Sequence, residues 1–169
     1  MKLIFATKNS GKTRELSKAL EETEFKVESL INQRIEAAPE TGSSFLENAL
    51  IKCKSVSETT GRPTIADDSG LVVPALGGRP GIYSARYAGP GASDEENVQK
   101  LIQEIRSISD RRAYFFCCLV FMISSDDPFP IFAQGLWKGE ILDTPVGLGG
   151  FGYDPIFYLP EYGMTAACL

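Results

Sequence analysis

The sequence predicts an α/β fold in a single domain over residues 1–169, with helices flanking a central mixed β-sheet. Strand-like and helix-like segments alternate in the first part of the chain, and strand-like segments cluster in the later part, a distribution typical of a mixed sheet. A chain of 169 residues with 43% hydrophobic and 23% charged residues has the composition of an ordinary globular domain with a sizeable core.

The N-terminal half is predicted to alternate strands and helices. Residues 2–7 and 25–30 have the apolar character of short strands, and a helix is expected over residues 12–22. Ser44 and Glu47 have the spacing of a capping box and open a second helix. Apolar residues follow that box at helical spacing: Phe45, Ala49, Leu50, Cys53 and Val56.

The next segments predict short strands at 64–67 and 71–73, separated by a bend at Ser69-Gly70, and then a long loop over 74–92. Loops of this length and glycine content are usually functional or disordered, and its aromatics and Arg86 favour function.

A second capping box at Ser93 and Glu96 opens a helix with an apolar face. The remaining expected elements are strands at 113–123, 129–134, 136–141 and 156–159, and the start of a helix at 165–167.

Composition excludes several classes of function. The net charge of −5 argues against a nucleic-acid polymer as partner. No apolar run reaches membrane-spanning length and the N-terminus is too short for a signal peptide, so we expect a cytoplasmic protein without a membrane partner. Four cysteines lack metal-ligand spacing and are interpreted as buried free thiols. The absence of histidine leaves carboxylates and lysines for the chemistry.

The segment from Ala6 to Thr13 nearly fits the pattern of a P-loop. It follows a predicted strand and opens a predicted helix, where backbone N–H groups and the helix dipole favour an anion. Candidate phosphate contacts are therefore Thr7, Lys8, Asn9, Ser10, Gly11 and Lys12. Two alternatives stay open: an ordinary strand-turn-helix with a solvated lysine, or a P-loop kinase or ATPase.

Asp67 and Asp68 are adjacent carboxylates at the end of an apolar strand, which is costly unless a positive group satisfies them. Mg²⁺ is the usual candidate, because it takes few carboxylates and prefers phosphate oxygens for its other ligands. Neighbouring strand residues face opposite ways, so one aspartate is expected to face the ligand of the Lys12 loop. The other is left to bind metal or cap the Ser69-Gly70 bend, and a turn pair without function is the alternative.

Other candidates also have structural alternatives. Glu47 completes a capping box, and Lys52 is compatible with a surface charge. Phe151 and Tyr153 are equally suited to stack on a purine or to lie in the core. Asp154 precedes Pro155 and is therefore expected to be extended.

Four ordered motifs together resemble the inosine triphosphate pyrophosphatase family, the XTP/dITP diphosphatases, along the chain from Lys2 to Leu169. The first motif, Thr-x-Asn-x-x-Lys-x-x-Glu, is matched by Thr7, Asn9, Lys12 and Glu15. The other three motifs run from Glu40 to Lys52, from Asp67 to Tyr87 and from Gly149 to Phe157.

The resemblance implies an elongated two-lobed α/β domain with a cleft between the lobes, usually a homodimer. It implies Mg²⁺-dependent hydrolysis of non-standard purine nucleoside triphosphates (ITP, dITP, XTP) to a monophosphate and pyrophosphate. Asp68 would be the general base, with Glu40 and Asp68 at the metal and Lys12 and Lys52 on the phosphates. Ser69 would contact substrate, and the base pocket would be lined by Phe151, Gly152, Tyr153 and Asp154.

The sequence departs from the family pattern at its end. Family members continue with a lysine and then a Ser-His-Arg segment that contacts the base, whereas this sequence ends at Leu169. The alternative function is therefore a catalytically impaired, truncated relative that binds metal and triphosphate or only dimerises.

Overall fold

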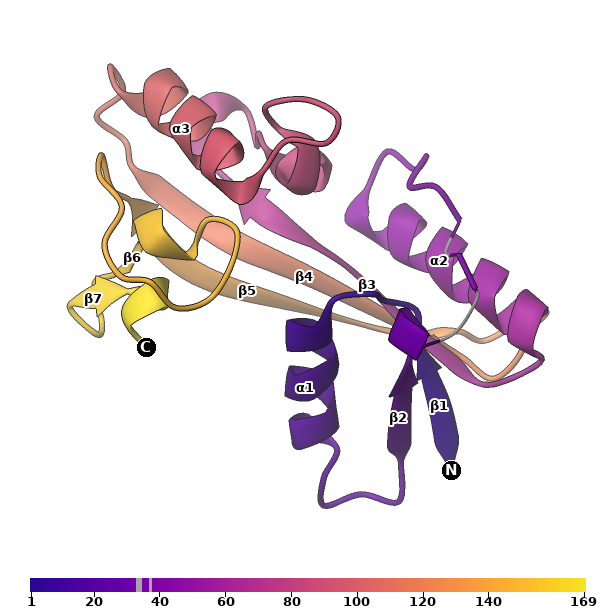
Figure 1. The fold of residues 1–169 in the computed structure, drawn as a ribbon. Helices are drawn as coiled ribbons and strands as arrows, with labels where there is room; N and C mark the ends of the chain where they lie inside the picture. The colour runs from indigo at the N-terminus through magenta and orange to yellow at the C-terminus, as the bar shows by residue number, and fades with distance from the viewer. Residues whose placement is uncertain (33–34, 37) are drawn as a thin grey trace. The chain divides into compact units, whose positions relative to one another are not determined.

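The computed structural model describes residues 1–32, 35–36 and 38–169, and the described part contains a seven-stranded sheet with the strand order β2-β1-β3-β4-β5-β6-β7 (Figure 1). The strands are β1 Lys2–Phe5, β2 Lys26–Ser29, β3 Thr64–Val72, β4 Arg112–Met122, β5 Ile131–Ile141, β6 Phe157–Leu159 and β7 Met164–Thr165. The helices are α1 Ser10–Ala19, α2 Phe45–Thr60 and α3 Asp94–Ile105. Strand β1 pairs in parallel with β2 and β3, whereas β5, β6 and β7 pair antiparallel. The predicted mixed α/β fold is therefore confirmed.

The described chain forms two compact units, each with its own core. Unit 1 comprises Met1–Asp68 and Cys117–Gln134, and unit 2 comprises Ser69–Phe116 and Gly135–Leu169. The predictions of a single domain and of a cleft between lobes stay predictions.

In unit 1, β1 and α1 form a strand-turn-helix, and α2 packs apolar side chains onto the sheet. The buried residues of this core are Ile4, Ala6, Leu30, Ala49, Cys53, Val56, Ala66, Val120 and Met122. Helix α1 begins at Ser10, two residues before the prediction, because the Asn9 side chain accepts the Lys12 N–H at 3.1 Å and caps the helix. Helix α2 is capped by Ser44, whose hydroxyl accepts the Glu47 N–H at 3.2 Å.

In unit 2, α3 begins with the predicted capping box of Ser93 and Glu96. Its apolar face joins a core of Leu71, Val73, Leu76, Tyr87, Val98, Leu101, Ile105, Ala113, Ile141, Tyr153, Ile156, Phe157 and Leu159. The predicted loop at 74–92 contains two 3-10 helices, Pro74–Leu76 and Gly81–Arg86.

Two strand predictions were wrong for the same reason. The expected break at Ser69-Gly70 lies inside the continuous strand β3, and the break expected near Gly135 lies inside β5. Neither Gly70 nor Gly135 has a positive φ, so the backbone stays extended through both glycines. As a result, Asp67 and Asp68 sit within a strand instead of preceding a bend.

Two local predictions in the C-terminal part also need correction. Asp154 opens a 3-10 helix, Asp154–Ile156, where an extended residue was expected. Residues 165–167 do not start an α-helix, because Met164–Thr165 forms β7 and Ala166–Cys168 forms a 3-10 helix.

The cysteines are free, and the interpretation as buried thiols holds for only two of them. Cys53 and Cys118 are buried, Cys117 is half-buried and Cys168 is exposed. Among the described residues, no helix combines the length and apolar character needed to cross a membrane.

Candidate active site

The two adjacent aspartates lie in β3 just past its pairing with β1. The last aligned pair of these strands is Phe5 with Ile65, so Asp67 and Asp68 extend beyond the end of β1, where the chain turns into α1. Both aspartates are buried, at 4% and 5% exposure. Buried carboxylates need charged or hydrogen-bonding partners, and these come from the two helices of unit 1.

Asp67 binds the lysine of the first motif. The ammonium of Lys12, in the first turn of α1, forms an ion pair with the Asp67 carboxylate. This contact brings the β1–α1 turn onto β3, as the phosphate-loop interpretation requires. It also shows that Lys12 is not the solvated lysine of the structural alternative.

Asp68 contacts α2, so the two neighbouring aspartates have different partners. Its Oδ2 atom accepts a hydrogen bond from Asn48 Nδ2 at 3.0 Å, and its Oδ1 lies 3.6 Å from Lys52 Nζ. Burial is the largest influence on Asp68 and raises the pKa of its carboxyl, although Lys52 and Asn48 act to lower it. A carboxyl with a raised pKa holds a proton more readily than an exposed aspartate.

Lys52 joins Asp68 to Glu40, the acid that precedes α2. Its Nζ donates to Glu40 Oε1 at 2.7 Å, and its side chain is only 12% exposed, so Lys52 is not a surface charge. Burial alone would lower the lysine pKa, but the hydrogen bond that Lys52 donates to Glu40 and the nearby carboxylates raise that pKa above the usual value. Lys52 therefore carries its full charge at neutral pH.

The turn before α1 is held by its own side chains. Thr7 Oγ1 accepts the Asn9 N–H at 3.1 Å, and the Asn9 carbonyl accepts from Thr13 Oγ1 at 3.0 Å. Lys8 and Ser10 are exposed, and Gly11 is half-buried. The helix N-terminus thus lies open beside the Lys12 ammonium, which favours an anion there.

Asn48 was not singled out in the sequence, and it links Asp68 to the segment before α2. It is fully buried, and its Oδ1 accepts the Gly42 N–H at 2.8 Å while its amide binds Asp68. Asn48 and Lys52 are four residues apart and share one face of α2, so helical spacing was the available signal. Glu47 has a structural role at the start of α2, since its carboxylate accepts from Ser43 N–H at 2.6 Å and from Ser43 Oγ at 2.8 Å. Because Ser43 precedes the N-cap Ser44, these bonds are not the reciprocal bond of the predicted capping box.

The candidates for the base pocket belong to unit 2. Tyr153 is buried in that core and donates its hydroxyl to the Ser84 carbonyl at 2.9 Å, whereas Phe151 is 48% exposed. The carboxylate of Asp154 accepts the Phe151 N–H at 2.9 Å, and that of Asp94 accepts the Gly152 N–H at 2.7 Å. The two carboxylates fix the backbone of this loop. Ser69 directly follows Asp68 in β3.

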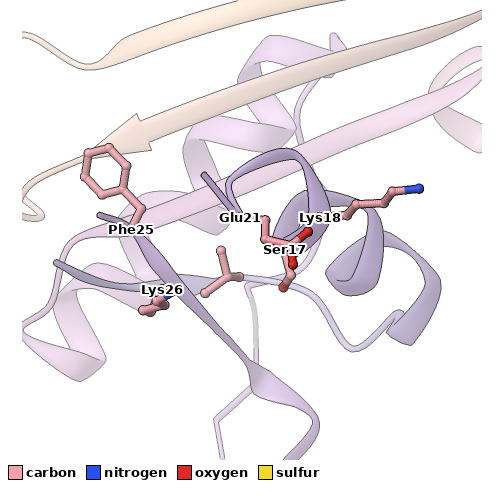
Figure 2. Close-up of a pocket in the computed structure, with 6 residues that line it drawn as sticks. Ser17, Lys18, Glu21, Phe25 and Lys26 are labelled. Atoms are coloured by element: carbon pink, nitrogen blue, oxygen red, sulfur yellow. The ribbon is translucent and has the colours of Figure 1, made fainter. Parts of the chain in front are cut away.

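Figure 2 shows a hollow in unit 1 next to α1 and β2, lined by Ser17, Lys18, Glu21, Phe25, Lys26 and Val27. None of the predicted site residues lines this hollow. The charged cluster around Asp67 and Asp68 is therefore the stronger candidate for the active site.

The carboxylates of this cluster fit a divalent cation whose other ligands are phosphate oxygens. Three carboxylates, those of Glu40, Asp67 and Asp68, lie beside the two ammonium groups of Lys12 and Lys52. In the described part of the chain, no three metal-ligating side chains are grouped as a complete protein site. Mg²⁺ needs only one or two carboxylates when phosphates and water supply the remaining ligands.

The fold and the cluster together define a mixed α/β protein with an acid–lysine site whose lysines come from two helices, α1 and α2. Comparison with known proteins gives the family. A sequence model of the Ham1 family matches residues 3–169, so the chain belongs to the Ham1 family. The family membership predicted from the four motifs is confirmed.

Curated relatives have an enzymatic name. The chain is 51% identical to a dITP/XTP pyrophosphatase of Yersinia pestis over 168 residues, which cover 98% of this chain and 85% of the relative. It is 46% identical to a dITP/XTP pyrophosphatase of Escherichia coli O157:H7 over 168 residues, with the same shares of the two chains. The predicted enzyme class, a nucleoside triphosphate pyrophosphatase, therefore agrees with the name of these relatives.

Solved structures agree with the fold. A HAM1 protein from Coxiella burnetii has a TM-score of 0.93 and 42% identity, covering 100% of this chain and 87% of that chain. The Ham1 protein of Staphylococcus aureus has a TM-score of 0.87 and 38% identity, covering 100% and 86%.

Proposed function

We propose that this protein is a cytoplasmic enzyme that hydrolyses non-standard purine nucleoside triphosphates such as dITP, ITP and XTP to the monophosphate and pyrophosphate. The observation that carries the proposal is the cluster of Asp68, Lys52, Glu40, Lys12 and Asp67 in unit 1. Its support is the name shared by relatives that are about half identical to this chain over nearly its full length.

The proposed reaction needs a base and positive groups around the phosphates. Asp68 takes a proton from water, whose oxygen forms a bond to the α-phosphorus while the bond to the pyrophosphate oxygen breaks. A carboxylate whose pKa is raised by burial is a better base than an exposed one, because base strength increases with pKa. Lys12 and Lys52 bind the phosphates and stabilise the charge on the leaving pyrophosphate.

Glu40 and Asp68 would hold Mg²⁺, which neutralises phosphate charge and orients the triphosphate when it is bound. The two carboxylates are already linked through Lys52, which contacts both. The β1–α1 turn from Thr7 to Lys12 would receive phosphate oxygens at the start of α1.

We assign the purine to the loop from Phe151 to Asp154, with Ser69 as a further substrate contact. The half-exposed ring of Phe151 is available for stacking, whereas Tyr153 supports the loop from the core. The backbone hydrogen bonds to Asp154 and Asp94 would keep this surface rigid.

We also propose a homodimer in which β5 contributes to the interface. Four large apolar residues of this strand are exposed, at 41–65%: Ile131, Phe132, Leu136 and Trp137. Exposed apolar residues gathered on one element are typical of protein interfaces. A nucleic-acid polymer and a membrane are not expected partners.

One assay separates this function from its alternatives. The protein is incubated with Mg²⁺ and dITP, XTP or ATP, and pyrophosphate and orthophosphate are measured separately. Pyrophosphate from dITP or XTP supports the proposal, and orthophosphate from ATP supports the kinase or ATPase alternative. The absence of both products supports the alternative of a catalytically impaired relative.

The Asp68→Asn variant then tests the residue that carries the chemistry. Loss of a general base typically lowers the rate by about 10²–10⁴-fold. Because the amide can still accept a bond from Asn48, the fold should be retained, which circular dichroism checks. A near-full rate of pyrophosphate release would remove Asp68 from the mechanism.

A further inference from the structure

We propose that Asn48 is the positioning residue that selects which oxygen of Asp68 acts as the base. The inference rests on the proposed function, because it assigns Asn48 a role in that same reaction. Asn48 acts through Asp68 and does not need to touch the substrate.

The geometry starts from a side chain that has no access to solvent. Asn48 is 0% exposed, in the first turn of α2. Its Nδ2 donates to Asp68 Oδ2 at 3.0 Å, and its Oδ1 accepts the Gly42 N–H at 2.8 Å. One amide therefore joins β3 to the segment that carries Glu40, two residues before Gly42.

The consequence is a fixed orientation of the Asp68 carboxylate. Its Oδ2 is held by the amide of Asn48, and its Oδ1 lies on the side of Lys52, 3.6 Å from Nζ. A carboxylate held by only one distant lysine would rotate about its terminal torsion, which has a broad energy profile. Asn48 removes that freedom and directs Oδ1 toward the phosphate-binding lysine.

The two hydrogen bonds at position 48 require a side-chain amide as long as that of asparagine. It needs one donor and one acceptor, and Asn supplies both, whereas Asp supplies only acceptors. Space is also limited, because a Cβ added to Gly42 would lie 2.8 Å from Asn48 Oδ1 and 2.6 Å from Glu47 Cβ. The close approach of residues 40–42 to α2 thus depends on the same side chain.

A purely structural role is the competing explanation, since buried polar groups are normally hydrogen-bonded. Ser57 offers the matched control on the same helix. It is 1% exposed and its hydroxyl donates to the Arg62 carbonyl at 3.1 Å, without contact to any carboxylate of the site. Ser57→Ala removes a buried hydrogen bond from α2 while leaving Asp68 oriented.

The experiment measures kcat and KM for dITP with Mg²⁺, together with urea unfolding, for Asn48→Asp, Asn48→Ala and Ser57→Ala. Asn48→Asp keeps the acceptor for Gly42 and loses the donor to Asp68. A misplaced catalytic group costs on the order of 10²-fold, so kcat should fall by about 10–100-fold while KM changes by less than about threefold. Ser57→Ala should lose stability but keep its kcat.

A double-mutant cycle distinguishes positioning from general damage. If Asn48 acts through Asp68, adding Asn48→Ala to Asp68→Asn should lower kcat by no more than about twofold further. Independent, multiplicative losses would overturn the inference, as would an unchanged kcat in either folded Asn48 variant. If both variants fail to fold, Asn48→Ser, whose shorter side chain with a single hydroxyl cannot reach both Asp68 and Gly42, is held to the same criterion.

The outcome for the wild type separates this inference from the proposed function. Failure to release pyrophosphate overturns the function and, with it, the role of Asn48. An active wild type whose Asn48 variants keep the wild-type kcat overturns the positioning role alone.

Discussion

Replacing Lys52 with methionine should destabilise the fold as well as slow the reaction. The Lys52 side chain is 12% exposed and its Nζ lies between Glu40 and Asp68, whose side chain is 7% exposed. Methionine keeps most of the side-chain volume and removes the ammonium group, with its charge and its hydrogen bond to Glu40. The change therefore measures the contribution of the ammonium group of Lys52.

The magnitude follows from what remains around Asp68. Removing one partner of a buried ion pair typically costs about 3–5 kcal/mol, because a buried charge is left uncompensated. Asp68 keeps its hydrogen bond from Asn48 and its carboxyl is able to take up a proton, so we expect about 1–3 kcal/mol at pH 7. For a chain of this size each kcal/mol lowers Tm by about 2–4 °C.

The pH dependence has a definite sign. Burial already raises the pKa of Asp68, and Lys52 opposes that shift, so loss of Lys52 raises the pKa further. A raised pKa means that the folded state binds a proton that the unfolded state releases, so stability is lost as the pH rises through the folded pKa. The cost of Lys52→Met, relative to the wild type, should therefore shrink as the pH is lowered from 7 to 5.

The assay is urea unfolding at pH 7 and pH 5, with Lys54→Met as the control. Lys54 lies on the same helix and is exposed, so its replacement removes the same charge without uncovering a buried carboxylate. Adding Asp68→Asn to Lys52→Met should recover most of the lost stability. The reasoning is refuted if Lys52→Met is as stable as Lys54→Met at pH 7, or if the double variant recovers nothing.

Three further predictions follow from single contacts. Gly42→Ala should lower the free energy of unfolding by about 1–3 kcal/mol and slow pyrophosphate release, since the added Cβ would lie 2.6 Å from Glu47 Cβ. Gly135→Ala is the control and should have neither effect, because nothing lies within 4 Å of its added Cβ. Equal urea midpoints for the two variants would contradict the prediction. Lys12→Ala should raise KM for dITP and also lower Tm, because it removes the ammonium that pairs with the buried Asp67 carboxylate; unchanged nucleotide affinity would remove Lys12 from the phosphate site. The hydrogen bond from Arg112 lowers the pKa of Asp110 to about 2, so the stabilisation from the Asp110 carboxylate is present above pH 3.8 and lost as the pH falls toward 2. The difference in Tm between Asp110→Asn and the wild type should therefore vanish near pH 2, and a difference that stays constant with pH would contradict this prediction.

Capping signals and motif residues were readable from the sequence because they depend on near neighbours. The caps Asn9 and Ser44 and the capping box of Ser93 and Glu96 lie within one helical turn of the groups they bind, so local spacing was enough to find α2 and α3. The strand breaks expected near Gly70 and Gly135 were wrong, because pairing with neighbouring strands keeps a glycine extended where local preference favours a turn.

The sequence by itself determined the family, the mixed α/β class and the residue types of the site, since four ordered motifs and the absence of histidine restrict the chemistry to carboxylates and lysines. Only the tertiary structure decided the partners: Lys12 with Asp67, Lys52 with both Glu40 and Asp68, and Asn48 as the link between β3 and residue 42. These contacts join residues 6–55 positions apart. Such pairings depend on how strands and helices pack, and local sequence patterns carry no information about that packing.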